Sequence, residues 1–388
     1  MKPRELQRRA RTLWTLFTAR TPVYVILYLT SRCNYRCPMC FYLNEIEDPE
    51  KSEITLPELD RLSRSIGPLI QLSLTGGEPF LRHDIPDVVD IFARNNRVQY
   101  VTIPTNGSLT DRVVQTVDRL VTDYPGVTFR IPVSLDGFPE DHDRIRARKS
   151  FASLRDTVAA LSRLRRRVDN LVLDINTCYS TLNEGKVDGL VDWVGRQFDV
   201  DNHTVTYVRG NADERTKDPS TAEYARIVED LRRRPVSRES RPFSSLLRAV
   251  TDYQRDIIRW TLRDDRMYVP CVAGRKLIII NEKGEVLPCE ILNERLGSLH
   301  DHAYDVRRLL ASPQAKGVVQ WIRDTRCHCT FECALATSVI FHKASYPRLL
   351  WRALRAWLHE RPSADVVRPD QRAATPAKLI PLLPKVVD

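Results

Sequence analysis

Between residues 23 and 208, short apolar runs alternate with longer segments that have helical periodicity. This alternation indicates repeated βα units built on a parallel sheet. The expected strands cover residues 23–29, 70–74, 99–105, 128–135, 171–176 and 204–208. Such units predict an α/β fold, a partial (β/α)6 barrel of the TIM type, with functional residues at the carboxyl ends of the strands.

Polar or glycine-containing motifs follow most of these expected strands. They begin at Cys33, Thr75, Asn106, Asp136 and Arg209. Parallel strands of a barrel all end at the same mouth, where such folds build their sites. We therefore expect the motifs to converge on one site.

The chain has nine cysteines, and eight of them fall into two groups. The density is too low for a disulfide scaffold, and the clustering indicates metal ligation in a reducing compartment. The first group is Cys33, Cys37 and Cys40. The second group is Cys271, Cys289, Cys327, Cys329 and Cys333. Cys178 stands alone.

The three-cysteine group constrains the metal that it can bind. Structural zinc takes four ligands, and Cys33-x3-Cys37-x2-Cys40 offers three with no fourth close in sequence. Thiolates also hold iron–sulfur clusters. A four-iron cluster on three cysteines leaves one iron open to a small molecule, and we favour this interpretation.

Over roughly residues 22–340 the chain resembles the radical S-adenosylmethionine (radical SAM) enzymes. Their CxxxCxxC loop corresponds to Cys33, Cys37 and Cys40, and their Gly-Gly-Glu-Pro segment to residues 76–79. The resemblance implies a [4Fe–4S] cluster whose open iron chelates SAM. An electron from that cluster would cleave SAM to methionine and a 5′-deoxyadenosyl radical, which takes a hydrogen atom from the substrate. A reductant such as flavodoxin or ferredoxin is implied as a partner.

The resemblance also implies a set of SAM-binding residues. Gly76 and Gly77 would let the backbone approach the methionine end, and Glu78 would accept a hydrogen bond from its ammonium group. Asn106 and Ser134 would reach the ribose or carboxylate, and Arg146 would pair with the carboxylate. The adenine would contact the backbone at Arg209 and the side chains of Met39, which stands where the family commonly has an aromatic residue, and Phe41.

The second cysteine group resembles the SPASM or twitch extension of radical SAM enzymes. A hairpin with its turn at Lys283–Gly284 is predicted between Cys271 and Cys289. Five cysteines suffice for one auxiliary [4Fe–4S] cluster, so we expect a small twitch-like domain. Its ligands would be Cys271, Cys289 and two of Cys327, Cys329 and Cys333, with a structural zinc site as the alternative. Such a cluster is suited to accepting the surplus electron of a substrate radical.

Two residues are candidates for direct action on the substrate. Cys178, at the end of the fifth expected strand, would donate a hydrogen atom in a radical epimerase, or else it is a buried thiol of the barrel wall. Glu290, beside Cys289, would accept a proton, or else it is a solvated glutamate.

The formal net charge of +10 is carried by the two ends of the chain. The region between them is formally neutral, which argues against nucleic-acid binding. Each basic end has an apolar stripe, within residues 6–17 and 350–358. These stripes either pack on the barrel or lie on an anionic membrane. The N-terminus shows no signal peptide, so we expect a cytoplasmic protein with peripheral membrane contact as the alternative.

We expect five parts in the chain. They are a basic helix (1–21), the radical SAM barrel (22–210), a helical linker (211–265), the cysteine-rich domain (266–341) and a basic tail (342–388).

The expected substrate follows from the short segment before the first strand, which leaves no room for an N-terminal peptide-recognition domain. This favours two-electron oxidation of a carbohydrate or another small metabolite, lipid-linked if the membrane interpretation holds. Epimerisation or dehydration of a sugar and modification of a ribosomal peptide remain alternatives. From another class, the chain could be a non-catalytic electron-transfer or nucleic-acid-binding protein, which would not need the Gly-Gly-Glu motif.

Overall fold

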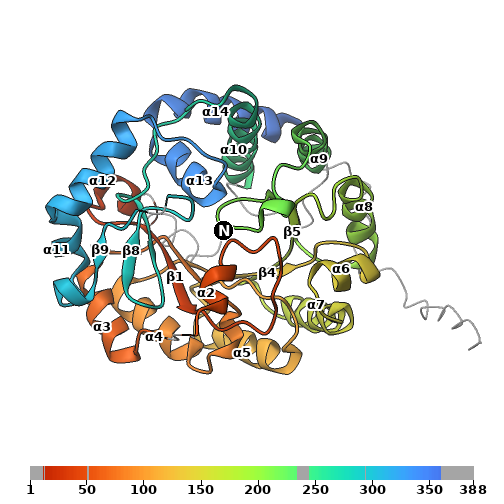
Figure 1. Cartoon of the computed structure of the whole chain (residues 1–388), viewed down its shortest axis with the longest axis horizontal. Helices are drawn as coiled ribbons and strands as arrows, with labels where there is room; N and C mark the ends of the chain where they lie inside the picture. The colour runs from red at the N-terminus through yellow and green to blue at the C-terminus, as the bar shows by residue number, and fades with distance from the viewer. Residues whose placement is uncertain (1–11, 13, 50–51, 234–243, 293, 360–388) are drawn as a thin grey trace, which may run out of the picture.

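The computed structural model describes residues 12, 14–49, 52–233, 244–292 and 294–359. Its named strands form one nine-stranded sheet in the order β6-β5-β4-β3-β2-β1-β7-β8-β9. Strands β1 to β6 pair in parallel, and Figure 1 shows the strands inside a ring of helices. The expected α/β fold, a partial barrel with a parallel sheet, is confirmed.

The strands lie close to the expected positions. They are β1 (Tyr24–Thr30), β2 (Gln71–Gly76), β3 (Tyr100–Thr102), β4 (Thr128–Ser134), β5 (Leu171–Tyr179), β6 (Asn202–Tyr207), β7 (Leu277–Ile280), β8 (Glu285–Leu287) and β9 (Gly297–Ser298). β3 is shorter than predicted because Pro104 lacks the N–H group that a ladder needs. Beyond it only Thr105 makes a bridge, to Val133.

The helices of the barrel follow the strands in alternation. They are α2 (Leu43–Glu47), α3 (Leu56–Ser65), α4 (Ile85–Asn96), α5 (Thr110–Asp123), α6 (Pro139–Ile145), α7 (Phe151–Arg165), α8 (Val187–Gln197) and α9 (Thr221–Arg233). The apolar residues of α3 illustrate the packing. Leu59 and Leu62 are fully buried in the outer core between helices and sheet, and burying each contributes about 2 kcal/mol.

β1 separates two apolar layers because its side chains alternate between the two faces of the sheet. Val25 and Leu27 belong to the outer core. Tyr24 and Tyr28 belong to a second group, which we call the inner cluster. Its buried members are Tyr24, Ile26, Tyr28, Tyr42, Ile46, Ala273, Leu277, Ile279, Cys289, Phe331 and Ala334. Every residue of β1 is therefore buried.

The predicted hairpin is present, and it extends the barrel sheet. β7 pairs in parallel with β1, where Tyr24 faces Leu277, and β8 returns antiparallel to β7. The turn contains Gly284, whose φ of 77° favours glycine. The expected division of the chain into five parts remains a prediction.

The remaining helices carry the C-terminal segments around the barrel. They are α10 (Ser244–Asp264), α11 (Val306–Ala311), α12 (Pro313–Asp324), α13 (Glu332–Phe341) and α14 (Tyr346–His359). α10 packs against both α13 and α14, which Figure 1 shows as neighbours. No helix among the described residues is long and apolar enough to cross a bilayer.

The apolar stripes of the two basic ends do not pack on the barrel where the structure describes them. Trp14 and Phe17 are 71% and 74% exposed. On α14, Leu350 and Leu354 are 65% and 53% exposed, whereas the neighbouring Leu349 is buried. The interpretation that these stripes cover the barrel is wrong for these residues. Residues 6–11 and the side chains of Trp357 and Leu358 lie outside the described set.

Candidate active site

The first cysteine group occupies the loop that directly follows β1. Cys33, Cys37 and Cys40 are each partly buried, and the loop turns where the Cys40 amide donates to the Cys37 carbonyl at 3.0 Å. Burial raises the pKa of Cys33 to about 11 and that of Cys40 to about 12. Cluster or metal binding would have to deprotonate these thiols, because ligands bind as thiolates. Three buried thiols in one loop fit the chemistry of a [4Fe–4S] cluster.

The Gly-Gly pair is needed for contact between two backbone segments. Gly76 has a φ of 121°, and a Cβ there would collide with the carbonyl oxygen of Thr30. A Cβ on Gly77 would collide with the carbonyl oxygen of Arg32. The Gly77 amide donates to Thr30 at 2.8 Å, and the Glu78 amide donates to Arg32 at 2.9 Å. The end of β2 thus clamps the start of the cysteine loop, a role that sequence reasoning did not foresee.

The Glu78 carboxylate already has protein donors. It is 1% exposed and accepts hydrogen bonds from the Thr105 hydroxyl (2.9 Å), the Asn106 amide (2.8 Å) and the Phe80 amide (3.2 Å). Burial raises its pKa to about 7, although these donors oppose the rise. Glu78 therefore joins the ends of β2 and β3, and its contact with the SAM ammonium group remains a prediction.

Asn106 connects the loop after β3 to the cysteine loop. Its side-chain amide donates to Asn34 Oδ1 at 2.8 Å, and Asn34 donates in turn to Ser108 Oγ at 2.8 Å. Asn34 lies between the first two cysteines of the loop, so this pair fixes the loop from the β3 side. The role of Asn34 in fixing the loop was not visible in the sequence, because asparagine is common in loops.

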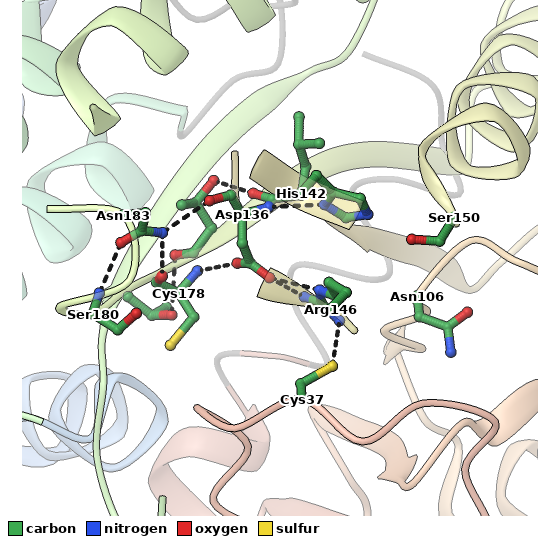
Figure 2. Close-up of polar contacts among 12 residues, drawn as sticks. Cys37, Asn106, Asp136, His142, Arg146, Ser150, Cys178, Ser180 and Asn183 are labelled. Carbon is green, nitrogen blue, oxygen red and sulfur yellow. Dashed lines mark hydrogen bonds and ion pairs between the residues drawn. The ribbon is translucent and has the colours of Figure 1, made fainter. Parts of the chain in front are cut away.

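Asp136, which begins one of the motifs expected at the mouth, is the hub of the opposite side of that mouth (Figure 2). It is fully buried and pairs with Arg146, whose Nη2 lies 2.5 Å from Asp136 Oδ2. The other carboxylate oxygen accepts the Cys178 amide at 2.8 Å. The Asp136 carbonyl accepts the Asn183 side-chain amide at 3.0 Å. One carboxylate thus holds together the ends of β4 and β5 and the C-terminus of α6.

Arg146 reaches from this hub to the cysteine loop. Its Nη1 lies 3.8 Å from Cys37 Sγ, and Figure 2 shows that sulfur directed at the guanidinium. The guanidinium therefore provides positive charge beside one thiol of the loop. The expected pairing of Arg146 with the SAM carboxylate is untested, and its partners in this structure are Asp136 and Cys37.

Cys178 is packed against apolar residues of the barrel wall beside this hub. Burial raises the pKa of its thiol above the usual value.

Ser134 is partly buried at the end of β4. Met39 is 5% exposed within the core that contains Tyr207 and Val208.

Arg209 connects the end of β6 to the second cysteine group. Its guanidinium lies 3.1 Å from Glu290 and 2.5 Å from Glu332, and it stacks over the Phe331 ring at 5.0 Å. Glu290 follows Cys289, and Glu332 precedes Cys333. Sequence reasoning missed Glu332, although it flanks a cysteine just as Glu290 does.

Gly210, with a φ of 67°, brings the chain against Phe41. A Cβ on Gly210 would lie 3.1 Å from the Phe41 Cβ atom and 3.6 Å from the Glu290 carbonyl oxygen. The structure therefore brings together Phe41 and the Arg209–Gly210 segment, which were both expected at the adenine.

The second cysteine group packs against the same inner cluster as the first. Cys33 and Cys40 contact this cluster, and so do Cys271, Cys329 and Cys333, while Cys289 is a buried member. Among the described residues, no three His, Cys, Asp or Glu side chains converge on a position for a single metal ion. Whether the second group holds an iron–sulfur cluster or structural zinc remains a prediction.

Comparison with known proteins agrees with these motifs. Residues 27–194 match the family model described as the radical SAM superfamily. A GTP 3′,8-cyclase of Yersinia pestis is 35% identical over 91 residues, which are 23% of this chain and 28% of that protein. A probable GTP 3′,8-cyclase of Methanocella arvoryzae is 30% identical over 174 residues, 43% of this chain and 51% of that protein. The chain spans about half or less of the length of these curated relatives.

Solved structures share the fold at low sequence identity. Streptococcus suis SuiB bound to S-adenosylmethionine has a TM-score of 0.55 at 15% identity, covering 81% of this chain and 72% of that one. Native anSMEcpe with bound AdoMet and a peptide has a TM-score of 0.55 at 16% identity, covering 86% and 99%.

The backbone clamp predicts that Gly77→Ala disturbs the cysteine loop. The added Cβ would collide with the Arg32 carbonyl oxygen and lie 3.1 Å from the Cys33 Cβ atom, so we expect a loss of about 2 kcal/mol in the free energy of unfolding and less iron bound after reconstitution. Gly126→Ala is the matched control, because no atom lies within 4 Å of its Cβ position. Urea unfolding and iron content measure both effects. Equal free energies of unfolding and equal iron contents of the two variants would contradict the backbone clamp.

The buried pair of Asp136 with Arg146 predicts that Asp136→Asn strongly lowers the free energy of unfolding. The change leaves the Arg146 guanidinium, whose side chain is 12% exposed, without its buried counter-charge, at a cost of about 3 kcal/mol. Asp141→Asn is the control in the following helix, since its pair with Lys186 is partly solvated and contributes at most about 1 kcal/mol. Urea midpoints of the two variants that agree within error would refute the role of the hub.

Proposed function

Because residues 27–194 form a radical SAM domain, we propose that this chain is an enzyme that oxidises a small substrate by two electrons inside the barrel. Cys33, Cys37 and Cys40 would hold the SAM-binding [4Fe–4S] cluster, and the second cysteine group would hold one auxiliary cluster. When bound, SAM and the two clusters supply removal of a hydrogen atom from the substrate and an acceptor for the electron that remains.

The observation that carries this proposal is the shared inner cluster. Both cysteine groups pack against it, and Tyr24 and Tyr28 of β1 are central members. The Tyr28 and Phe41 rings lie 6.5 Å apart between centroids, and the Tyr28 and Tyr42 rings 4.7 Å apart. A shared apolar cluster beside thiols of both groups would limit the access of water, which favours controlled transfer of an electron over side reactions.

Glu290 is suited to receive the proton that a two-electron oxidation releases. Its side chain is 8% exposed, and Arg209 orients its carboxylate. It lies next to Cys289 and beside the Tyr28 phenol, at the border between the inner cluster and the second cysteine group. Cys178 takes no step in this proposal, because its packing in the barrel wall agrees with a structural thiol.

The substrate class that we propose is broader than the carbohydrate that the sequence favoured. The matched relatives are named for GTP, and the neighbouring structures of SuiB and anSMEcpe include peptide complexes. None of these names supports the carbohydrate expectation. We therefore propose a small molecule with an oxidisable alcohol or amine carbon, reduced flavodoxin or ferredoxin being the electron donor.

Cleavage of SAM tests the first part of the proposal. After anaerobic reconstitution and reduction with dithionite, the wild type is expected to form 5′-deoxyadenosine at least tenfold faster than Cys37→Ala, which lacks one ligand of the first cluster. Chromatography with mass detection measures the product. Equal amounts from both proteins, also in the presence of candidate substrates, would reject the enzyme interpretation.

We further propose that α14 lies on an anionic membrane surface. Tyr346, Leu350, Trp351 and Leu354 are exposed together on this helix. The helix is anchored from its other side, where Arg352 pairs with Asp256 at 2.5 Å. The apolar face therefore points away from the barrel, and the basic chain supplies attraction to anionic lipid.

Vesicle co-sedimentation tests this surface. At 150 mM salt, the wild type is expected to bind vesicles containing phosphatidylglycerol and not pure phosphatidylcholine vesicles. Trp351→Gln combined with Leu350→Gln is expected to reduce binding at least fivefold, because it removes exposed apolar area. Trp321→Gln on α12, where the side chain is 48% exposed, is the matched control. Unchanged binding by the double variant would exclude this face.

A further inference from the structure

The second cysteine group has five thiols, one more than the four ligands that one auxiliary cluster needs. One of the five has different neighbours from the others. Cys327 and Cys329 line a common cavity with Cys271. This cavity is bounded by the segment after α10, which contains Tyr268 and Val269. Cys333 does not line it, although its neighbours Ala334 and Leu335 do.

Cys289 lies at the other end of the hairpin from Cys271. Its Sγ accepts the Leu292 amide at 3.3 Å. Burial raises the pKa of Cys327 to about 11, and the charges of Cys271 and Cys289 raise it further. Burial also raises the pKa of Cys329 to about 12; the Phe331 amide opposes this rise, and the charges of Cys289, Cys271 and Cys327 add to it. These four thiols therefore influence one another.

Cys333 has different neighbours. Its Sγ accepts the Tyr24 hydroxyl at 3.3 Å, and that hydroxyl also contacts Ser73 Oγ at 2.9 Å. Tyr24 and Ser73 belong to β1 and β2, so the sulfur is directed at the interior of the barrel. The charged groups that act on it are Glu290, Arg209 and Glu332.

We infer that Cys271, Cys289, Cys327 and Cys329 are the ligands of the auxiliary cluster, and that Cys333 is a free thiol directed at the barrel interior. The inference rests on the proposed auxiliary cluster and assigns its ligands. It places an unligated thiol in the barrel interior among the charged groups Arg209, Glu290 and Glu332. Glu332 Oε1 is buried there without a hydrogen-bond partner among the described residues, which marks this polar group as incomplete in the ligand-free chain.

Iron and sulfide content after anaerobic reconstitution tests the assignment without using activity. The wild type is expected to hold about eight irons per chain, as two four-iron clusters require. Cys333→Ser should keep this content, whereas Cys327→Ser and Cys329→Ser should fall to about half. Loss of iron in Cys333→Ser equal to that in Cys329→Ser would overturn the assignment.

Maleimide labelling of the reconstituted wild type gives a second readout that needs no variant. Removing the clusters with a chelator is expected to raise the labelling rate of Cys327 and Cys329 at least fivefold and to leave that of Cys333 within twofold. Protection of Cys333 by the cluster would contradict the inference.

The two proposals fail in distinguishable ways. A wild type with only about four irons and the same labelling of Cys327 before and after chelation would reject the auxiliary cluster and this assignment together. Formation of 5′-deoxyadenosine by that protein would leave the SAM-cleaving part of the proposed function standing.

Discussion

The contact between the end of β2 and the loop after β1 is the constraint on which the site depends. Two amides of the Gly77–Glu78 segment donate to carbonyls of Thr30 and Arg32, and only glycine permits the close approach. The loop that carries Cys33, Cys37 and Cys40 is thereby fixed to the barrel before any cofactor binds. Asn34 and Arg146 restrain the same loop from the β3 and β4 sides.

The alternation of β1 explains how two distant cysteine groups meet. One face of the strand completes the outer core, and the other face carries Tyr24 and Tyr28 into the inner cluster. β7 adds to the edge of β1 and brings Cys271 and Cys289 to the same cluster. Arg209, which follows β6, then joins the barrel to the second group through its ion pairs with Glu290 and Glu332.

Much of the fold could be predicted from the sequence because it depends on local patterns. Apolar runs and helical periodicity located the six barrel strands, and Lys283–Gly284 located the hairpin turn. Partner choice depends on three-dimensional packing and could not be predicted. The ion pair of Arg146 with Asp136 and the backbone contact at Gly76 and Gly77 were not foreseen, and the SAM contacts expected of these residues remain predictions. The contact of Cys333 with Tyr24, on which the proposed ligand assignment depends, likewise joins residues far apart in the sequence.

The central claim is that the chain holds two separate clusters and that only the first binds SAM. Electron paramagnetic resonance of the reduced protein, with and without SAM, tests it most directly. We predict that SAM changes the signal of the wild type, and that a variant with Cys33, Cys37 and Cys40 all replaced by alanine retains one signal that SAM leaves unchanged. A silent triple variant, or one whose remaining signal responds to SAM, would contradict the account.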